Sequence, residues 1–174
     1  MQVHCMENCL LLIVLSVAVV LDFRFRRISN RLIVCGILMA IGLHLFLYGG
    51  KDILTVLWNI SFPVIVLYLF YLVGALGAGD IKLFSVIGGF VSWDLLVRIM
   101  LLSLFIGGVE SLLKLLVQKD MRQRIRGALQ HLVRFCGGDK SAYPKDFTGG
   151  KNLIHFSLPM LLGTIGAMLW ELHV

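Results

Sequence analysis

Charged side chains are scarce in this sequence. Only 15% of the 174 residues are Asp, Glu, Lys or Arg, whereas 59% are hydrophobic and the mean hydropathy is +0.91. Soluble domains carry about 25% charged residues, so this chain has too little polar surface to cover its apolar residues in water. The shortage of charge excludes a soluble, fibrous or disordered protein. It predicts a single membrane-embedded domain that covers residues 1–174.

The residue spacings that create metal sites are also missing. The four cysteines form no Cys-x-x-Cys pair, which is the spacing that a zinc site uses. The five histidines are scattered and form neither a His-x-x-x-His nor a His-Glu-x-x-His pattern. The sequence therefore predicts no metal site and no cofactor.

Long uncharged runs predict the transmembrane helices. A bilayer core of about 30 Å needs roughly 20 apolar residues in a helix. Residues 32–48, 53–73 and 152–170 contain no charge, and residues 95–117 are apolar apart from three charged side chains. Two further uncharged runs, at residues 9–21 and 83–93, are shorter than a full span. Length alone does not decide whether these two runs cross the membrane.

The positions of the basic residues decide the number of crossings. The basic cluster at residues 24–31 and the basic segment 119–151 are both expected in the cytoplasm, because Lys and Arg concentrate on that side. Both segments lie there only if residues 80–117 cross twice, with a turn near residues 92–94. We therefore expect an all-α polytopic membrane protein with six transmembrane helices and with both termini outside.

The segment 118–151 is expected to form a cytoplasmic loop between the fifth and sixth transmembrane helices. Its first half places apolar residues at helical spacing among arginines, which is typical of a basic amphipathic helix on a membrane surface. Residues 137–150 contain Gly, Pro, Lys and Asp and predict a loop. The net charge of +6 is thus explained by membrane topology and contact with the lipid bilayer, and nucleic acid is not an expected partner.

Two aspartates are expected at the same depth on the cytoplasmic side. Asp22 falls in the last turn of a first helix at residues 5–24, and Asp80 falls in the first turn of a fourth helix at residues 79–93. A carboxylate at the centre of a bilayer costs about 2.5–3.5 kcal/mol and less near its edge, so two of them call for a reason. Two neighbouring carboxyl groups share a proton, which leaves one base and one acid, as in aspartic proteases. Asp22 and Asp80 are therefore the predicted catalytic pair.

Each aspartate also has a simpler interpretation. Asp22 is close in sequence to Arg26, which offsets its charge at a membrane boundary. Asp80 at the beginning of a helix is favoured by the helix dipole. The occurrence of both aspartates at one depth, next to several glycines, favours catalysis.

The residues near Asp80 and Asp22 suggest how a substrate would bind. Gly77 and Gly79 precede Asp80, and glycine adopts backbone angles that are closed to other residues, so we expect an extended edge that holds a substrate there. Lys82 is expected to extend to the membrane surface, and the alternative is a contact with substrate or with the rest of the protein. Asn30 either caps the second helix or shapes the site. These four residues are the candidate substrate-binding residues.

Two motifs resemble those of the type IV prepilin peptidases. Residues 77–83, Gly-Ala-Gly-Asp-Ile-Lys-Leu, resemble the family's GxGD motif. Asp22 followed by Arg-Ile-Ser-Asn at residues 27–30 resembles the D-x4-[RK]-I-x-N pattern at the end of the family's first helix. The resemblance covers essentially the whole chain. It implies an intramembrane aspartic endopeptidase of the cell membrane that removes the basic leader from prepilins, with Asp22 and Asp80 as catalytic residues.

The chain differs from the larger prepilin peptidases in one respect. It lacks the cytoplasmic loop with paired Cys-x-x-Cys motifs that these members carry. It is similar to the small peptidases of tight-adherence (Flp) pilus systems. The resemblance therefore implies cleavage of a type IV, Flp-like prepilin without N-methylation.

Two other functions remain open at this point. One is a different GxGD protease that cleaves other membrane segments. The other is a non-enzymatic transporter or assembly factor in which the aspartates carry protons or ions, although such a protein would place its acids near the middle of the spans. A serine protease is disfavoured because no serine lies in a Gly-x-Ser-x-Gly or similar setting. The sequence leaves the oligomeric state open.

Overall fold

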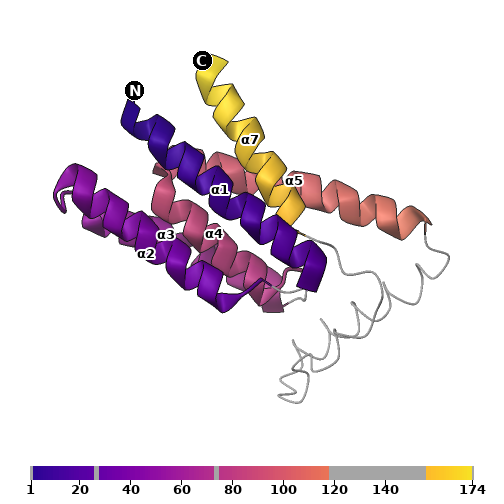
Figure 1. The fold of residues 1–174 in the computed structure, drawn as a ribbon. Coiled ribbons are helices and arrows are strands. Elements are labelled where there is room, and N and C mark those ends of the chain that lie inside the picture. Colours follow the sequence, from indigo (N-terminus) through magenta and orange to yellow (C-terminus); the bar gives the residue numbers. More distant parts are fainter. Residues whose placement is uncertain (1, 26–27, 73–74, 118–155, 174) are drawn as a thin grey trace.

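The part of the chain that the structure describes is a bundle of helices. The computed structural model describes residues 2–25, 28–72, 75–117 and 156–173 (Figure 1). In chain order its helices are α1 (Gln2–Phe25), α2 (Asn30–Tyr48), α3 (Ile53–Leu72), α4 (Ala78–Phe90), α5 (Trp93–Val117) and α7 (Ser157–His173). The expected all-α class is confirmed for these residues. The amphipathic helix expected within residues 118–151 lies outside them.

The helices differ in length. Helices α1, α2, α3 and α5 are long and apolar enough to cross a membrane. Helix α7 has 17 residues and α4 has only 13, which makes α4 about 20 Å long, shorter than a hydrocarbon core of about 30 Å. Helix α4 ends at Phe90, so the turn expected near residues 92–94 lies at residues 91–92. Crossing of the membrane by all six helices stays a prediction.

Successive helices run in alternating directions along the bundle. Both chain termini lie at the same end of the bundle in Figure 1. This end also carries the α2–α3 connection at residues 49–52 and the α4–α5 connection at residues 91–92, and we call it the turn end. The opposite end carries the end of α1 and the beginnings of α2, α4 and α7. We call it the aspartate end, because Asp22 and Asp80 lie there.

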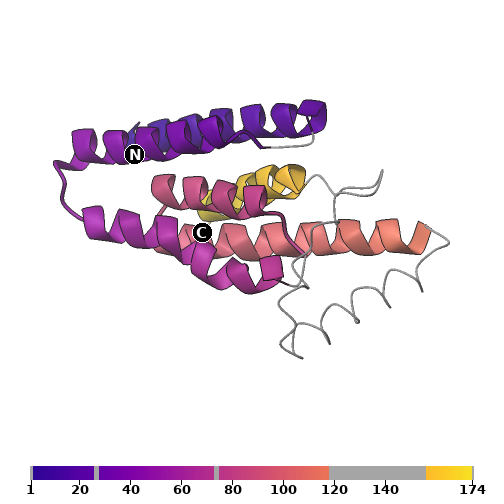
Figure 2. The same ribbon diagram turned by 90° about the horizontal axis from the view of Figure 1, so that it is seen from below.

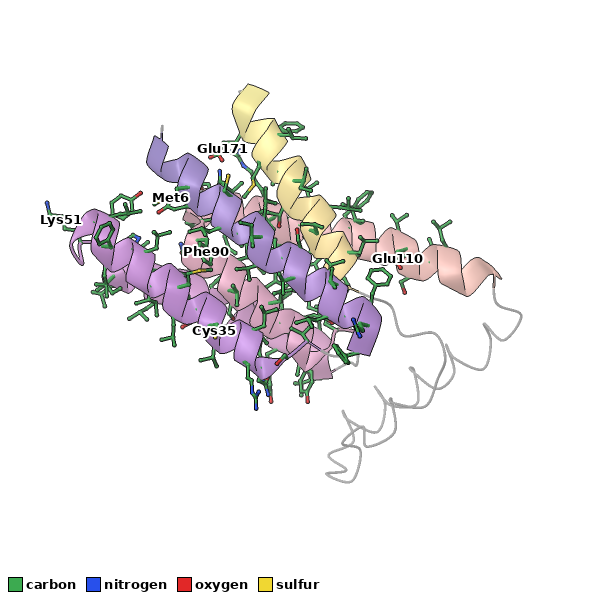
Figure 3. The ribbon with its side chains drawn as sticks, viewed as in Figure 1. Met6, Cys35, Lys51, Phe90, Glu110 and Glu171 are labelled. Atoms are coloured by element: carbon green, nitrogen blue, oxygen red, sulfur yellow. The ribbon has the colours of Figure 1, made fainter. Side chains whose placement is uncertain are left out.

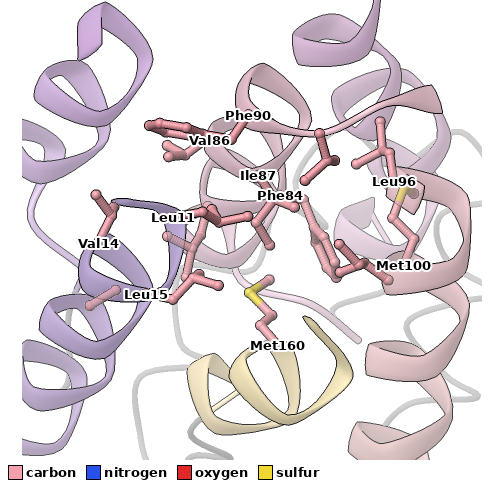
Figure 4. Close-up of a cluster of buried hydrophobic side chains, with 14 of the residues drawn as sticks. Leu11, Val14, Leu15, Phe84, Val86, Ile87, Phe90, Leu96, Met100 and Met160 are labelled. Carbon is pink, nitrogen blue, oxygen red and sulfur yellow. The ribbon is translucent and has the colours of Figure 1, made fainter. Parts of the chain in front are cut away.

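Helix α4 forms the centre of the bundle. Figure 2 shows α4 and α7 between one layer made by α1 and α2 and another made by α3 and α5. Nine of the 13 residues of α4 are buried, as expected for a helix that is surrounded by others. Figure 4 shows the cluster formed around α4 by side chains from α1, α5 and α7, with these residues labelled: Leu11, Val14, Leu15, Phe84, Val86, Ile87, Phe90, Leu96, Met100 and Met160.

Glycines let two helix pairs approach closely. A Cβ atom added to Gly88 of α4 would overlap the backbone carbonyl of Asn59 in α3. A Cβ atom added to Gly163 of α7 would overlap Ser103 of α5. Small residues allow such backbone contacts between membrane helices, where apolar burial alone drives association weakly. The two glycines therefore let α4 pack closely against α3, and α7 closely against α5.

The outer surface of the bundle is apolar along its length. Figure 3 shows carbon-rich side chains projecting outwards from the helices; of the labelled charged residues, Lys51 and Glu171 lie at the turn end and Glu110 lies on α5. Phe46, Leu54 and Phe105 are 85%, 78% and 71% exposed. A continuous apolar surface of this kind is suited to lipid rather than to water. The bundle therefore has the surface of a membrane protein, as the composition predicts.

The turn end is held by a buried amide and by aromatic packing. The Nδ2 atom of Asn59 donates a hydrogen bond to the carbonyl of Val91 at 3.1 Å, which ties α3 to the α4–α5 connection. The rings of Phe62 and Trp93 meet edge to face with centroids 4.4 Å apart. Helix α2 ends at this side because Gly49, with φ 62°, adopts a left-handed conformation and donates its N–H to Leu45.

Candidate active site

Asp22 lies in the last turn of α1 and is almost completely buried. Its side chain is 9% exposed. Its Oδ2 atom accepts a hydrogen bond of 2.6 Å from the hydroxyl of Ser157, the first residue of α7. The carboxyl group of Asp22 is thus held at the point where α1 ends and α7 begins.

Asp80 lies in the first turn of α4 and organises the beginning of that helix. Its Oδ2 atom accepts a hydrogen bond of 3.1 Å from the backbone N–H of Gly77, and its own N–H donates to the Gly77 carbonyl at 3.1 Å. A carboxylate at the third helical position that bonds back to the residue before the helix is a known helix-starting arrangement. Helix α4 therefore begins at Ala78.

The two carboxyl groups are carried to one end of the bundle by different helices. Asp22 lies in the last turn of α1 and Asp80 in the first turn of α4, and the charge of Asp22 acts on Asp80. Asp22 is buried, whereas Asp80 is partly accessible. This arrangement resembles the pair expected from the sequence, and two such carboxyl groups are able to serve as base and acid towards one water molecule.

The backbone before Asp80 differs from the extended edge expected there. Gly77 is extended, with φ −79° and ψ 151°, and is exposed. Gly79 is helical, because the hydrogen bonds of Asp80 start α4 at Ala78. The expectation that Gly79 needs unusual backbone angles is therefore wrong, since no φ in the left-handed region occurs at either glycine. Instead, Gly79 faces Ile28, where an added Cβ atom would make an ordinary contact of 3.5 Å.

A side-chain hydrogen bond joins α2 to α4 beside this site. The Nζ atom of Lys82 donates to Oδ1 of Asn30 at 3.1 Å, and both residues are exposed. The residue that precedes α2 is Ser29, so of the two alternatives for Asn30 the structure does not show the capping of that helix. Asn30 and Ile28 both follow Asp22 in the sequence. Asn30 contacts Lys82 and Ile28 faces Gly79, and both of these partners lie within two positions of Asp80. The two sequence motifs therefore meet in space.

Ser157 is the residue of this site that sequence reasoning missed. It is completely buried, and it is 135 positions away from Asp22 in the chain. The only signal for it was its position near the beginning of the last predicted span, at the end of the bundle where Asp22 was expected. Within the ranges 2–25, 28–72, 75–117 and 156–173, no group of three or more His, Cys, Asp or Glu residues gathers to hold a metal.

The fold and the site together define a helical membrane protein with a pair of carboxyl groups at one end of its bundle. The model of the type IV leader peptidase family matches residues 9–112, which contain both motifs and both aspartates. The chain belongs to this family, and it is accordingly a membrane protease of the leader-peptidase type. No curated protein and no solved structure gives a match to the chain. Ser157 lies outside the matched residues.

Proposed function

We propose that this protease is an aspartic endopeptidase whose catalytic residues are Asp22 and Asp80. The observation that carries this proposal is the placement of the two carboxyl groups. They come from two helices, lie at the same end of the bundle and are near enough to interact. A pair of this kind supplies the base and the acid that peptide hydrolysis needs, without a metal or cofactor.

In the proposed reaction one carboxylate takes a proton from a water molecule, and the water oxygen adds to the carbonyl carbon of the scissile peptide bond. The protonated carboxyl group of the pair donates a hydrogen bond to the carbonyl oxygen. A proton then passes to the leaving nitrogen as the C–N bond breaks, which yields a carboxylic acid and an amine. The pair returns to its starting state with one shared proton.

Gly77 is proposed to keep the pair open to substrate. It is exposed and extended, and a Cβ atom added to it would lie 3.0 Å from Oδ2 of Asp80. The absence of a side chain therefore leaves one face of the Asp80 carboxyl group uncovered. Gly79, Lys82 and Asn30 complete this side of the site, where they hold the beginnings of α2 and α4 together next to the substrate.

The proposed substrate is a type IV, Flp-like prepilin. Its apolar helix would lie in the cytoplasmic membrane, and its basic leader would be cut at the cytoplasmic boundary, where the aspartate end lies if all six helices cross. Membership of the leader-peptidase family supports a protein substrate of this class. The absence of paired Cys-x-x-Cys motifs supports cleavage without methylation of the new N-terminus.

The test is co-expression of a Flp-type prepilin with the protein in bacterial membranes, followed by measurement of the prepilin mass. Asp22→Asn and Asp80→Asn should each lower cleavage by about 10²–10⁴-fold, because each removes a proton-transfer group. Asp94→Asn is the matched control, since Asp94 is an exposed acid in the first turn of α5 at the turn end. Cleavage at the wild-type rate by either Asp22→Asn or Asp80→Asn would refute the catalytic pair. An added methyl group on the mature pilin would refute the absence of methylation.

A further inference from the structure

A short buried hydrogen bond joins α1 to α7 at the catalytic pair. The hydroxyl of Ser157 donates to Oδ2 of Asp22 at 2.6 Å, and both side chains are buried. A distance of 2.6 Å is short for a hydroxyl that donates to a carboxyl oxygen, which marks a strong hydrogen bond. Asp80, in contrast, accepts a longer bond of 3.1 Å from a backbone N–H.

Ser157 is held in place by the packing of its neighbours. The ring of the preceding residue, Phe156, lies 6.2 Å from the ring of Phe84 in α4 and fills the space above Gly107 in α5. One turn further along α7, Met160 is completely buried in the core (Figure 4). The beginning of α7 is therefore fixed against both α4 and α5. A hydroxyl on such a fixed helix end restricts the rotation of the side chain to which it donates.

We propose that Ser157 is the positioning residue of Asp22. Its hydroxyl fixes one carboxyl oxygen of Asp22, so that the carboxylate keeps a single orientation towards the water and Asp80. The inference rests on the proposed aspartic mechanism and extends it to α7, outside the residues that the family model matches. Ser157 contacts Asp22 and is completely buried, so it acts on catalysis through the aspartate.

Kinetic measurements separate this role from a role in folding. Ser157→Ala should lower kcat about 10- to 100-fold, since small misplacement of a catalytic group has effects of this size, and should leave KM unchanged. Ser157→Thr retains the hydroxyl and should recover most of the lost kcat. Ser103→Ala is the matched control: Ser103 is equally buried in α5, and its Oγ atom has no hydrogen-bond partner within the described part of the chain. Its kcat should equal that of the wild type.

The hydrogen bond itself is testable without any substrate. Thermal unfolding of the purified protein in detergent is compared for the wild type, Ser157→Ala, Asp22→Ala and the double variant. Because the two side chains bond to each other, the loss of Tm in the double variant should be smaller than the sum of the two single losses. Additive losses would refute the hydrogen bond and with it the positioning role.

The remaining outcomes distinguish this inference from the proposed function. A wild-type protein that cleaves prepilin, together with a Ser157→Ala variant of unchanged kcat, would overturn the positioning role alone. A wild-type protein that leaves every prepilin uncut would overturn the proposed function and, with it, the positioning role of Ser157 in catalysis, whatever the unfolding data show. Loss of all activity in both Ser157→Ala and Ser157→Thr, with an unchanged Tm, would assign Ser157 a direct part in the chemistry instead.

Discussion

The two ends of the bundle use polar groups in different ways. At the turn end a neutral amide, Asn59, donates to the backbone carbonyl of Val91, and aromatic rings pack beside it. At the aspartate end the hydrogen bonds join side chains of different helices and include charged groups, with Ser157 bonded to Asp22 and Lys82 bonded to Asn30.

This difference suggests that the turn end contributes mainly to the stability of the bundle and the aspartate end to its activity. The amide of Asn59 satisfies the buried carbonyl of Val91, whereas its own Oδ1 atom has no hydrogen-bond partner among the described residues. Burial of a carboxylate near a membrane boundary adds a cost, and each end of the bundle buries one, Glu7 at the turn end and Asp22 at the aspartate end. In the proposed mechanism the acids at the aspartate end act in chemistry, whereas the amide and ring contacts at the turn end act in packing. Changes at the turn end should lower stability, and changes beside Asp80 should lower activity.

The largest effect on stability is expected from Gly88→Ala. The new Cβ atom would overlap the Asn59 carbonyl, so α4 must move away from α3, at a cost of about 1–3 kcal/mol or more. Gly42→Ala is the matched control, because an added Cβ atom there meets nothing within 4 Å and alanine favours a helix. Thermal unfolding in detergent measures both variants. An unchanged Tm for Gly88→Ala would contradict the close contact of α3 and α4.

A smaller loss of stability is expected from Asn59→Ala. This change leaves the Val91 carbonyl without its donor in the interior, which costs about 1–3 kcal/mol. The kcat of the folded variant should equal that of the wild type, because the change lies at the turn end. Ser61→Ala, an exposed change in the same helix, should alter stability by about 0.5 kcal/mol or less. A large fall in kcat for Asn59→Ala at unchanged Tm would contradict the assignment of the turn end to stability alone.

The smallest effect is expected when a glycine of the GxGD motif is replaced by alanine. The loss of cleavage activity should differ between the two glycines. Gly77→Ala brings a Cβ atom to 3.0 Å from the Asp80 carboxyl group, so cleavage should fall by about tenfold, which corresponds to about 1.4 kcal/mol. Gly79→Ala makes only an ordinary contact with Ile28 in a helical backbone and should retain most activity. Initial cleavage rates of the two variants provide the comparison. Equal losses, or a larger loss for Gly79→Ala, would refute the assigned difference.

Much of the fold was predictable because hydropathy and helix ends are local properties. The uncharged runs 32–48 and 53–73 differ by at most two residues at either end from α2 (Asn30–Tyr48) and α3 (Ile53–Leu72). The turn between α4 and α5 was expected from charge distribution near residues 92–94 and lies at residues 91–92, which overlaps the predicted place. The short fourth helix was expected over residues 79–93 and is α4 (Ala78–Phe90), whereas its burial at the centre of the bundle was not expected, because that burial depends on the neighbouring helices.

The site was predictable only in part. Asp22 and Asp80 were recognisable because they break apolar sequence at two helix ends. The fourth helix was expected to begin at Gly79 and begins one residue earlier, at Ala78, whereas the extended edge expected at Gly79 is absent because the side chain of Asp80 starts the helix there. The partner of Asn30 was also missed. Lys82 and Asn30 are 52 positions apart, and the sequence around one residue does not indicate a contact with the other.

The sequence by itself determined that this chain is a helical membrane protein, where most of its helices begin and end, and which two acids stand at helix ends. These properties follow from composition, charge and motifs that each short segment carries alone. Only the tertiary structure decided which side chains meet, because this depends on the rotation and depth of each helix. Close contacts at Gly88 and Gly163 let α4 pack against α3 and α7 against α5. In the packed bundle the hydroxyl of Ser157, at the beginning of α7, meets the carboxyl group of Asp22.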